Sequence, residues 1–136
     1  MKPRNRAAKG ARLEKLAKEG ELVKSVMQLL QAHGFQVFRR NTGAMTSNYT
    51  RKDGSTRERF VRFSVPGMAD IWGWQALTGR HIEVEVKRRG VKPTPLQEQW
   101  LQSARDGGVI AFWCDSMGMA EAELVRASEV DRFQHR

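Results

Sequence analysis

The stretch that decides the fold is HIEVEVK, residues 81–87, which alternates polar and apolar side chains without interruption. Successive side chains of a β-strand point to opposite faces, so the apolar residues of this stretch share one face. The charged residues Glu83, Glu85 and Lys87 share the other face. The alternation therefore predicts a strand. By itself, its charged face is most simply explained as a solvated sheet surface.

Hydrophobic periodicity and turn signals on either side predict the remaining elements. They are a helix over 18–33, strands over 35–40, 60–63, 69–74 and 109–114, a flexible hairpin within 41–58, and a helix from Pro95 to about Arg105 capped by Thr94. For the tail from about Met119 we expect one more strand and a short helix near 128–133. The order α-β-β-β-α-β predicts an α/β sandwich around a central mixed sheet flanked by helices.

The length of 136 residues fits a single domain. We expect residues 1–17 to be a basic N-terminal arm, either disordered or the start of a helix, and residues 18–136 to be the domain. The formal net charge of +9 indicates an anionic partner, and nucleic acid is the first expectation because of its dense phosphate charge.

Composition also excludes several classes of protein. No apolar run is long enough for a membrane span, and the N-terminus lacks the apolar segment of a secretory signal. Cys114 is the only cysteine, which excludes an internal disulfide and fits a reducing, cytoplasmic setting. No glycine-rich nucleotide loop occurs, which argues against ATP use.

Asp70 changes the interpretation of the charged strand face. It begins the strand over 69–74, which we expect to pair with the strand over 81–87 as a hairpin. Asp70 and Glu85 would then converge beside Lys87. Two carboxylates are sufficient protein ligands for Mg²⁺, which activates water and neutralises phosphate charge. A neighbouring lysine stabilises developing charge. These residues predict a phosphodiesterase site with Mg²⁺ or Mn²⁺.

Two sets of residues carry a family resemblance. Gly67-Met68-Ala69-Asp70 followed by Glu85-Val86-Lys87 resembles the signature of the PD-(D/E)XK nucleases, whose fold is a restriction-endonuclease-like α/β sandwich. Flanking segments resemble the VRR-NUC branch of that superfamily, which includes stand-alone phage and bacterial nucleases and a DNA-repair nuclease domain. The flanking segments are Arg40-Asn41-Thr42-Gly43, residues 93–101 and Gly107-Gly108-Val109.

The resemblance implies roles for individual residues. Asp70 and Glu85 would be metal ligands together with the backbone carbonyl of Val86, and Lys87 would be the catalytic lysine. Gln97 would position groups near the site. The sequence departs from the superfamily at Ala69, where proline is frequent, and at Glu83, an additional acid for which the sequence indicates no role.

The superfamily usually supplies a further acid from its first helix. Glu19 and Glu21 compete for this position, and both are also ordinary acids for the start of a helix. We favour Glu19 as a metal ligand because it shares the face of Leu22 and Val23 that we expect to meet the sheet.

Basic residues flank the predicted site in two clusters, a pattern that suits a groove tracking phosphates. The candidate nucleic-acid ligands are Arg39, Arg40, Asn41, Arg88, Arg89 and Lys92; the predicted hairpin adds Arg51, Lys52, Arg57, Arg59 and Arg62. Backbone contacts of this kind carry no base readout, so we expect recognition of DNA shape.

The sequence therefore predicts a metal-dependent DNA endonuclease selective for branched, flap or Holliday-junction DNA, active in the cytoplasm of a bacterial or phage-infected cell and able to form a homodimer. Two alternatives stay open. One is a non-catalytic nucleic-acid-binding module, although acids facing phosphate would repel it. The other is an exonuclease, or a restriction-system subunit, of the same superfamily.

Overall fold

A computed structural model describes residues 6–41, 44–62 and 64–134 of the chain. Parts of three sequence predictions fall outside these ranges: residues 1–5 of the basic arm, Thr42-Gly43 of the quoted motif, and Phe63 of a predicted strand. The described residues contain three helices and six strands. They are α1 (Arg6–Ala32), β1 (Phe35–Arg39), β2 (Ala44–Thr50), β3 (Thr56–Arg62), β4 (Ile71–Gln75), β5 (His81–Val86), α2 (Pro95–Asp106), β6 (Ile110–Cys114) and α3 (Met117–Gln134).

Four strands form one mixed sheet in the order β1-β4-β5-β6. The β1–β4 and β4–β5 pairs are antiparallel, while β5 and β6 run parallel because α2 carries the chain across the sheet between them. The expected α/β architecture with a mixed sheet is confirmed, and so is the pairing of the strand that follows Asp70 with the strand that contains Glu85.

Helices cover both faces of this sheet. Val26 and Leu30 of α1 and Leu124 of α3 pack with the apolar side of β5 in the main core. On the opposite face, Leu101 of α2 packs with Ala111 in a smaller core. Residues 82–86 are consequently buried on both sides, so the charged face of β5 lies beneath α2 and not in solvent.

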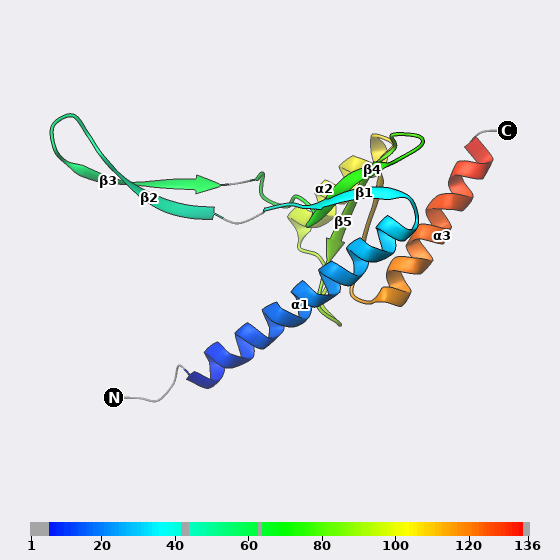
Figure 1. The fold of residues 1–136 in the computed structure, drawn as a ribbon, viewed down its shortest axis with the longest axis horizontal. Coiled ribbons are helices and arrows are strands. Elements are labelled where there is room, and N and C mark those ends of the chain that lie inside the picture. The colour runs from blue at the N-terminus through cyan, green and yellow to red at the C-terminus, as the bar shows by residue number, and fades with distance from the viewer. Residues whose placement is uncertain (1–5, 42–43, 63, 135–136) are drawn as a thin grey trace.

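The β2–β3 hairpin forms a separate two-stranded sheet, called the ribbon below. In Figure 1 it extends away from the four-stranded sheet and the helices. The Asp53 carboxylate accepts hydrogen bonds from the backbone N–H (2.9 Å) and hydroxyl (2.6 Å) of Ser55. Gly54 between them has φ +85°. A hairpin was predicted within residues 41–58; the structure forms one from β2 and β3, with its turn at Asp53-Gly54.

Both terminal segments are helical. Helix α1 begins at Arg6, before the predicted residue 18, which agrees with the second of the two alternatives for the N-terminal arm, the start of a helix. The alanines, lysines and leucines of this segment favour helix, and no proline occurs between Arg6 and Ala32. The tail after Cys114 is one helix, α3, so the predicted strand from Met119 is wrong. Ala120 and Leu124 are buried four residues apart, a helical spacing that the sequence already contained.

No helix in the described ranges is long and apolar enough to cross a membrane.

Candidate active site

Asp70 lies immediately before β4, where the antiparallel pairing places it beside the end of β5. Its Oδ2 accepts a hydrogen bond from the backbone N–H of Val86 at 3.0 Å. Its backbone carbonyl accepts one from the N–H of Arg40, just past β1, at 2.6 Å. The half-buried carboxylate is therefore fixed to β5 at the residue between Glu85 and Lys87.

Glu85 and Lys87 complete a compact group. The Nζ of Lys87 lies 3.4 Å from Oε1 of Glu85, and the two side chains are only 14% and 3% exposed. The backbone N–H of Lys87 donates to the carbonyl of Cys114 at 2.8 Å, which extends the β5–β6 pairing past the end of β5. The three residues that the sequence predicted as catalytic therefore lie together at one end of the sheet.

Gln97 links the first turn of α2 to Glu85. Its Nε2 donates to Glu85 Oε1 at 2.9 Å. Its Oε1 accepts the backbone N–H of Thr94 at 2.9 Å, while the Thr94 hydroxyl accepts the N–H of Gln97 at 3.3 Å. This is a capping box, in which the side chain at the third helical position closes onto the N-cap. The cap thus fixes the amide that orients the Glu85 carboxylate.

The electrostatics of Glu85 follow from this burial. Loss of hydration, and then the negative charge of Asp70, raise the pKa of Glu85 from its ordinary 4.5 to about 8, while the positive charge of Lys87 opposes the shift. Lys87 offsets only part of the cost of ionising a buried acid beside a second acid. Strongly perturbed carboxyl groups of this kind gather at functional sites.

The residues fit a divalent cation in two respects. Asp70 and Glu85 offer carboxylate oxygens, the ligands that Mg²⁺ prefers, and Oε2 of Glu85 is buried with no hydrogen-bond partner among the described residues. No group of three or more His, Cys, Asp or Glu side chains in the described ranges is arranged to hold a metal ion. A pair of acids nevertheless meets the usual requirement of Mg²⁺, which keeps several waters.

The predicted helix acid is only partly located. Glu19 is half-buried, whereas Glu21 is exposed, as expected if Glu19 faces inward. No described contact joins Glu19 to Asp70 or Glu85, and the metal-ligand role of Glu19 stays a prediction. The same holds for the backbone carbonyl of Val86.

Glu83, to which the sequence assigned no role, forms a buried ion pair. Arg40 donates to both of its carboxylate oxygens, at 2.6 and 2.9 Å, and His81 lies 3.0 Å from Oε1. Arg40 also donates to the carbonyl of Ala69 at 3.0 Å, directly before Asp70. Because one guanidinium holds β5 and the segment leading into Asp70 together, the pair positions the end of β4 next to Asp70.

Arg40 was a candidate nucleic-acid ligand, but its side chain is 13% exposed and is occupied by this pair. Its guanidinium also lies over the rings of Trp72 and Trp100, at 5.9 and 5.8 Å from their centroids. We therefore assign Arg40 a structural role.

Gly67 brings the loop before Asp70 against α2. It has φ +89°, and a Cβ at this position would lie 2.7 Å from the carbonyl oxygen of Leu96. Only glycine combines this backbone conformation with so close an approach. The contact fixes the loop beside the helix turn that carries Gln97.

Basic side chains border the site on the side of α1. Lys18, Arg88 and Arg89 line a cavity of about 490 Å³, with Asp115 as its acidic member. Arg88 directly follows Lys87 in the chain, so this cationic surface continues from the acid pair. Arg39, Asn41 and Lys92, the other candidates, are exposed.

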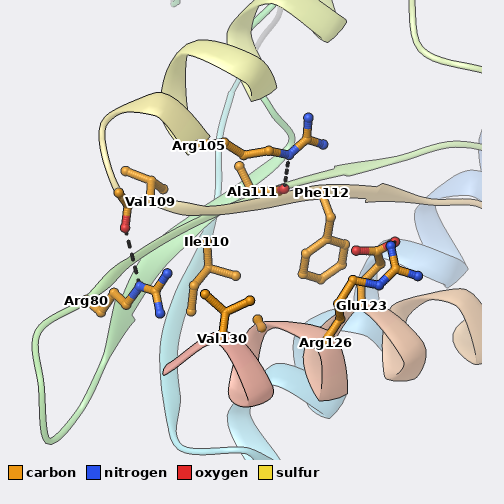
Figure 2. Close-up of a pocket in the computed structure, with 11 residues that line it drawn as sticks. Arg80, Arg105, Val109, Ile110, Ala111, Phe112, Glu123, Arg126 and Val130 are labelled. Carbon is orange, nitrogen blue, oxygen red and sulfur yellow. Dashed lines mark hydrogen bonds and ion pairs between the residues drawn. The ribbon is translucent and has the colours of Figure 1, made fainter. Parts of the chain in front are cut away.

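A second cavity, of about 590 Å³, lies between α2, β6 and α3 and contains none of the residues predicted from sequence (Figure 2). Arg105 Nε donates to the carbonyl of Ala111 at 2.8 Å, and Arg80 Nε donates to that of Gly108 at 3.3 Å. Arg105 thus covers a backbone acceptor of β6, an edge strand of the sheet, and Arg80 covers one in the segment between α2 and β6.

Cys114 is buried, and burial raises the pKa of its thiol to about 12. A thiol that stays protonated is a poor nucleophile, so Cys114 acts as a buried apolar residue.

Comparison with known proteins adds no family assignment: no model of a protein family matches the chain, and no curated protein matches it.

Proposed function

We propose that this protein is a metal-dependent DNA endonuclease of the PD-(D/E)XK type, similar to the VRR-NUC branch. The observation that carries the proposal is the convergence of Asp70, Glu85 and Lys87 at one end of the mixed sheet, with Glu85 buried and held by Gln97. A solvated charged strand, the alternative explanation of these residues, would not lie beneath a helix.

The cation, Mg²⁺ or Mn²⁺, would be held by Asp70 and Glu85, and when bound it neutralises phosphate charge and lowers the pKa of a water. Gln97 orients the Glu85 carboxylate through a fixed amide. Lys87, whose Nζ lies beside the Glu85 carboxylate, stabilises the negative charge that builds on the phosphoryl oxygens during hydrolysis. Arg88 and Arg89 contact the phosphates on one side of the cleaved bond.

The substrate class follows from the type of contact. The cationic surface next to the site is suited to phosphates and not to base edges, so selectivity would come from DNA shape, such as flaps or four-way junctions. A two-fold symmetric junction is most simply engaged by a homodimer. Sedimentation of the protein on junction DNA tests this point, and a monomeric complex would contradict it.

Cleavage assays test the activity itself. Labelled four-way junction, flap and linear duplex DNA would be incubated with Mg²⁺, Mn²⁺ or EDTA. We expect metal-dependent cutting that falls by roughly 100-fold or more in Asp70→Asn and Lys87→Met, because each removes a group that stabilises the transition state. Glu121→Gln and Lys24→Met, exposed on α3 and α1, are the controls matched in charge.

Two results would contradict the proposal. Binding of DNA without cutting in either metal would favour the non-catalytic binding module. Cutting that survives both active-site substitutions would place the chemistry elsewhere. Release of single nucleotides from ends, with no internal cuts, would instead indicate an exonuclease with the same site.

A further inference from the structure

Among the residues whose burial the structure describes, none in the ribbon of β2 and β3 belongs to a hydrophobic core. Its strands pair with each other and not with the four-stranded sheet, and residues 48–60 are all exposed. A two-stranded hairpin by itself is marginally stable in water. A segment of this kind gains stability when another molecule packs along it.

The ribbon carries a concentrated positive charge. Residues 44–62 contain five basic and two acidic side chains, a net charge of +3 out of the +9 of the whole chain. The basic residues are Arg51, Lys52, Arg57, Arg59 and Arg62. This excess points to a polyanion as the partner.

The register divides the ribbon into two faces. Tyr49 pairs with Arg57 and Ser47 with Arg59, so these four side chains share one face. This cationic face carries no acid, because Glu58 pairs with Asn48 on the other face. Tyr49 is 43% exposed and offers a ring and a hydroxyl beside the two arginines.

The root of the ribbon lies at the candidate active site. The chain leaves the sheet after Arg40 and returns to it at Asp70, and the Arg40 N–H donates to the Asp70 carbonyl at 2.6 Å. Each strand has seven residues, which span about 23 Å at roughly 3.3 Å per residue. The ribbon therefore reaches about two-thirds of a DNA helical turn from the site, since one turn is about 34 Å.

We propose that the ribbon is a DNA-binding arm that lies in the major groove of the duplex next to the cleaved bond. Arg57 and Arg59 contact phosphates there, and the turn with Arg51 and Lys52 contacts the backbone beyond. The B-form major groove, about 12 Å wide, admits a two-stranded ribbon, whereas the major groove of double-stranded RNA is too narrow. This inference rests on the proposed nuclease function and adds to it the surface that binds the duplex.

Equilibrium binding of a labelled 20-bp DNA duplex, followed by fluorescence anisotropy in EDTA at several salt concentrations, tests the arm. We expect Arg57→Gln/Arg59→Gln to weaken binding about tenfold or more and to reduce the slope of log K against log salt by about 2, one per lost phosphate contact. The control matched in charge, Lys24→Gln/Arg126→Gln, alters exposed residues of α1 and α3 and should retain both values.

A second measurement places the arm on the DNA. Ser55→Cys introduces an exposed thiol in the turn that a maleimide dye labels selectively, because Cys114 is buried and its thiol stays protonated. Energy transfer from this dye to an acceptor in the duplex should rise on binding DNA. An RNA duplex should bind more weakly than the DNA duplex, and the arginine substitutions should lower its affinity by a smaller factor.

The outcomes separate the two proposals. A protein that cuts DNA at Asp70 and Lys87, but whose ribbon variants bind as the wild type does and whose dye shows no transfer, would overturn the arm alone. A protein that binds DNA through the ribbon but never cuts would overturn the nuclease and keep the arm. Equal losses of DNA affinity in the ribbon variant and the control variant would show that the effect comes from net charge in general, and would overturn the arm.

Discussion

The buried acid Glu85 makes the stability of the metal-free protein depend on pH. Its pKa in the folded protein is about 8, against an ordinary 4.5 in the unfolded chain, because burial and the charge of Asp70 disfavour its ionised form. Between these values the folded state holds a proton that the unfolded chain releases. The free energy of unfolding should therefore fall as the pH rises through this window.

The magnitude follows from proton linkage. One proton held only by the folded state gives a slope of about 1.4 kcal/mol per pH unit. From pH 5.5 to 7.5 the contribution of Glu85 should fall by roughly 2–3 kcal/mol, which is a large part of the stability of a small domain. Glu85→Gln removes the ionisation, keeps an oxygen that can accept the hydrogen bond of Gln97, and should lose this part of the pH dependence.

The assay is urea unfolding in EDTA at pH 5.5, 6.5 and 7.5 for the wild type, Glu85→Gln and the exposed control Glu121→Gln. We expect the free energy of unfolding of Glu85→Gln to rise steadily relative to that of the wild type as the pH increases. The control should follow the wild type. Saturating Mg²⁺ should raise the free energy of unfolding of the wild type selectively at pH 7.5. A wild type and Glu85→Gln with parallel pH profiles would refute the reasoning.

Four further single substitutions and one double variant test how the site is built. Arg40→Met leaves Glu83 buried without its main partner and should cost about 3–5 kcal/mol by urea unfolding, whereas Arg40→Met/Glu83→Leu should recover much of the loss; an equally unstable double variant would contradict the buried ion pair. Thr94→Ala should lower the free energy of unfolding by about 1 kcal/mol in thermal unfolding and leave DNA cleavage nearly unchanged. Gln97→Ala should also reduce cleavage. Equal cleavage by the two variants would contradict the role of the Gln97 amide. Gly73→Ala places a Cβ against the backbone of β1 and should lower the melting temperature markedly, as followed by circular dichroism. An unchanged melting temperature would show that β1 and β4 can move apart at this point without cost.

Much of the fold was readable from local pattern. The alternation in residues 81–87 predicted β5, and the threonine and proline at 94–95 predicted the start of α2, because strand periodicity and helix caps are local properties. The tail was predicted wrongly because its apolar residues, although Ala120 and Leu124 have a helical spacing, are as a set only weakly periodic. There the decision came from Leu124, which packs into the main core only in a helix.

The candidate site divides in the same way. Asp70, Glu85 and Lys87 were identified from residue type and spacing, since a hairpin pairing brings them together once the strands are recognised. The role of Glu83 was not predictable, because its partner Arg40 lies 43 residues away in the chain. Likewise, the exposed position of the ribbon depends on which strands join the sheet, and the sequence around residues 44–62 reads only as a polar hairpin.

The sequence by itself determined the local elements and the residue types able to do phosphate chemistry, because backbone propensity, alternation and capping act over a few neighbouring residues. Only the tertiary structure decided which charges are buried, which are paired and which face solvent. Placing α2 over the charged face of β5 removed water from Glu83 and Glu85. Desolvation raised the pKa of Glu85 and required an arginine for Glu83, while Arg51, Arg57 and Arg59 of the ribbon stayed in solvent.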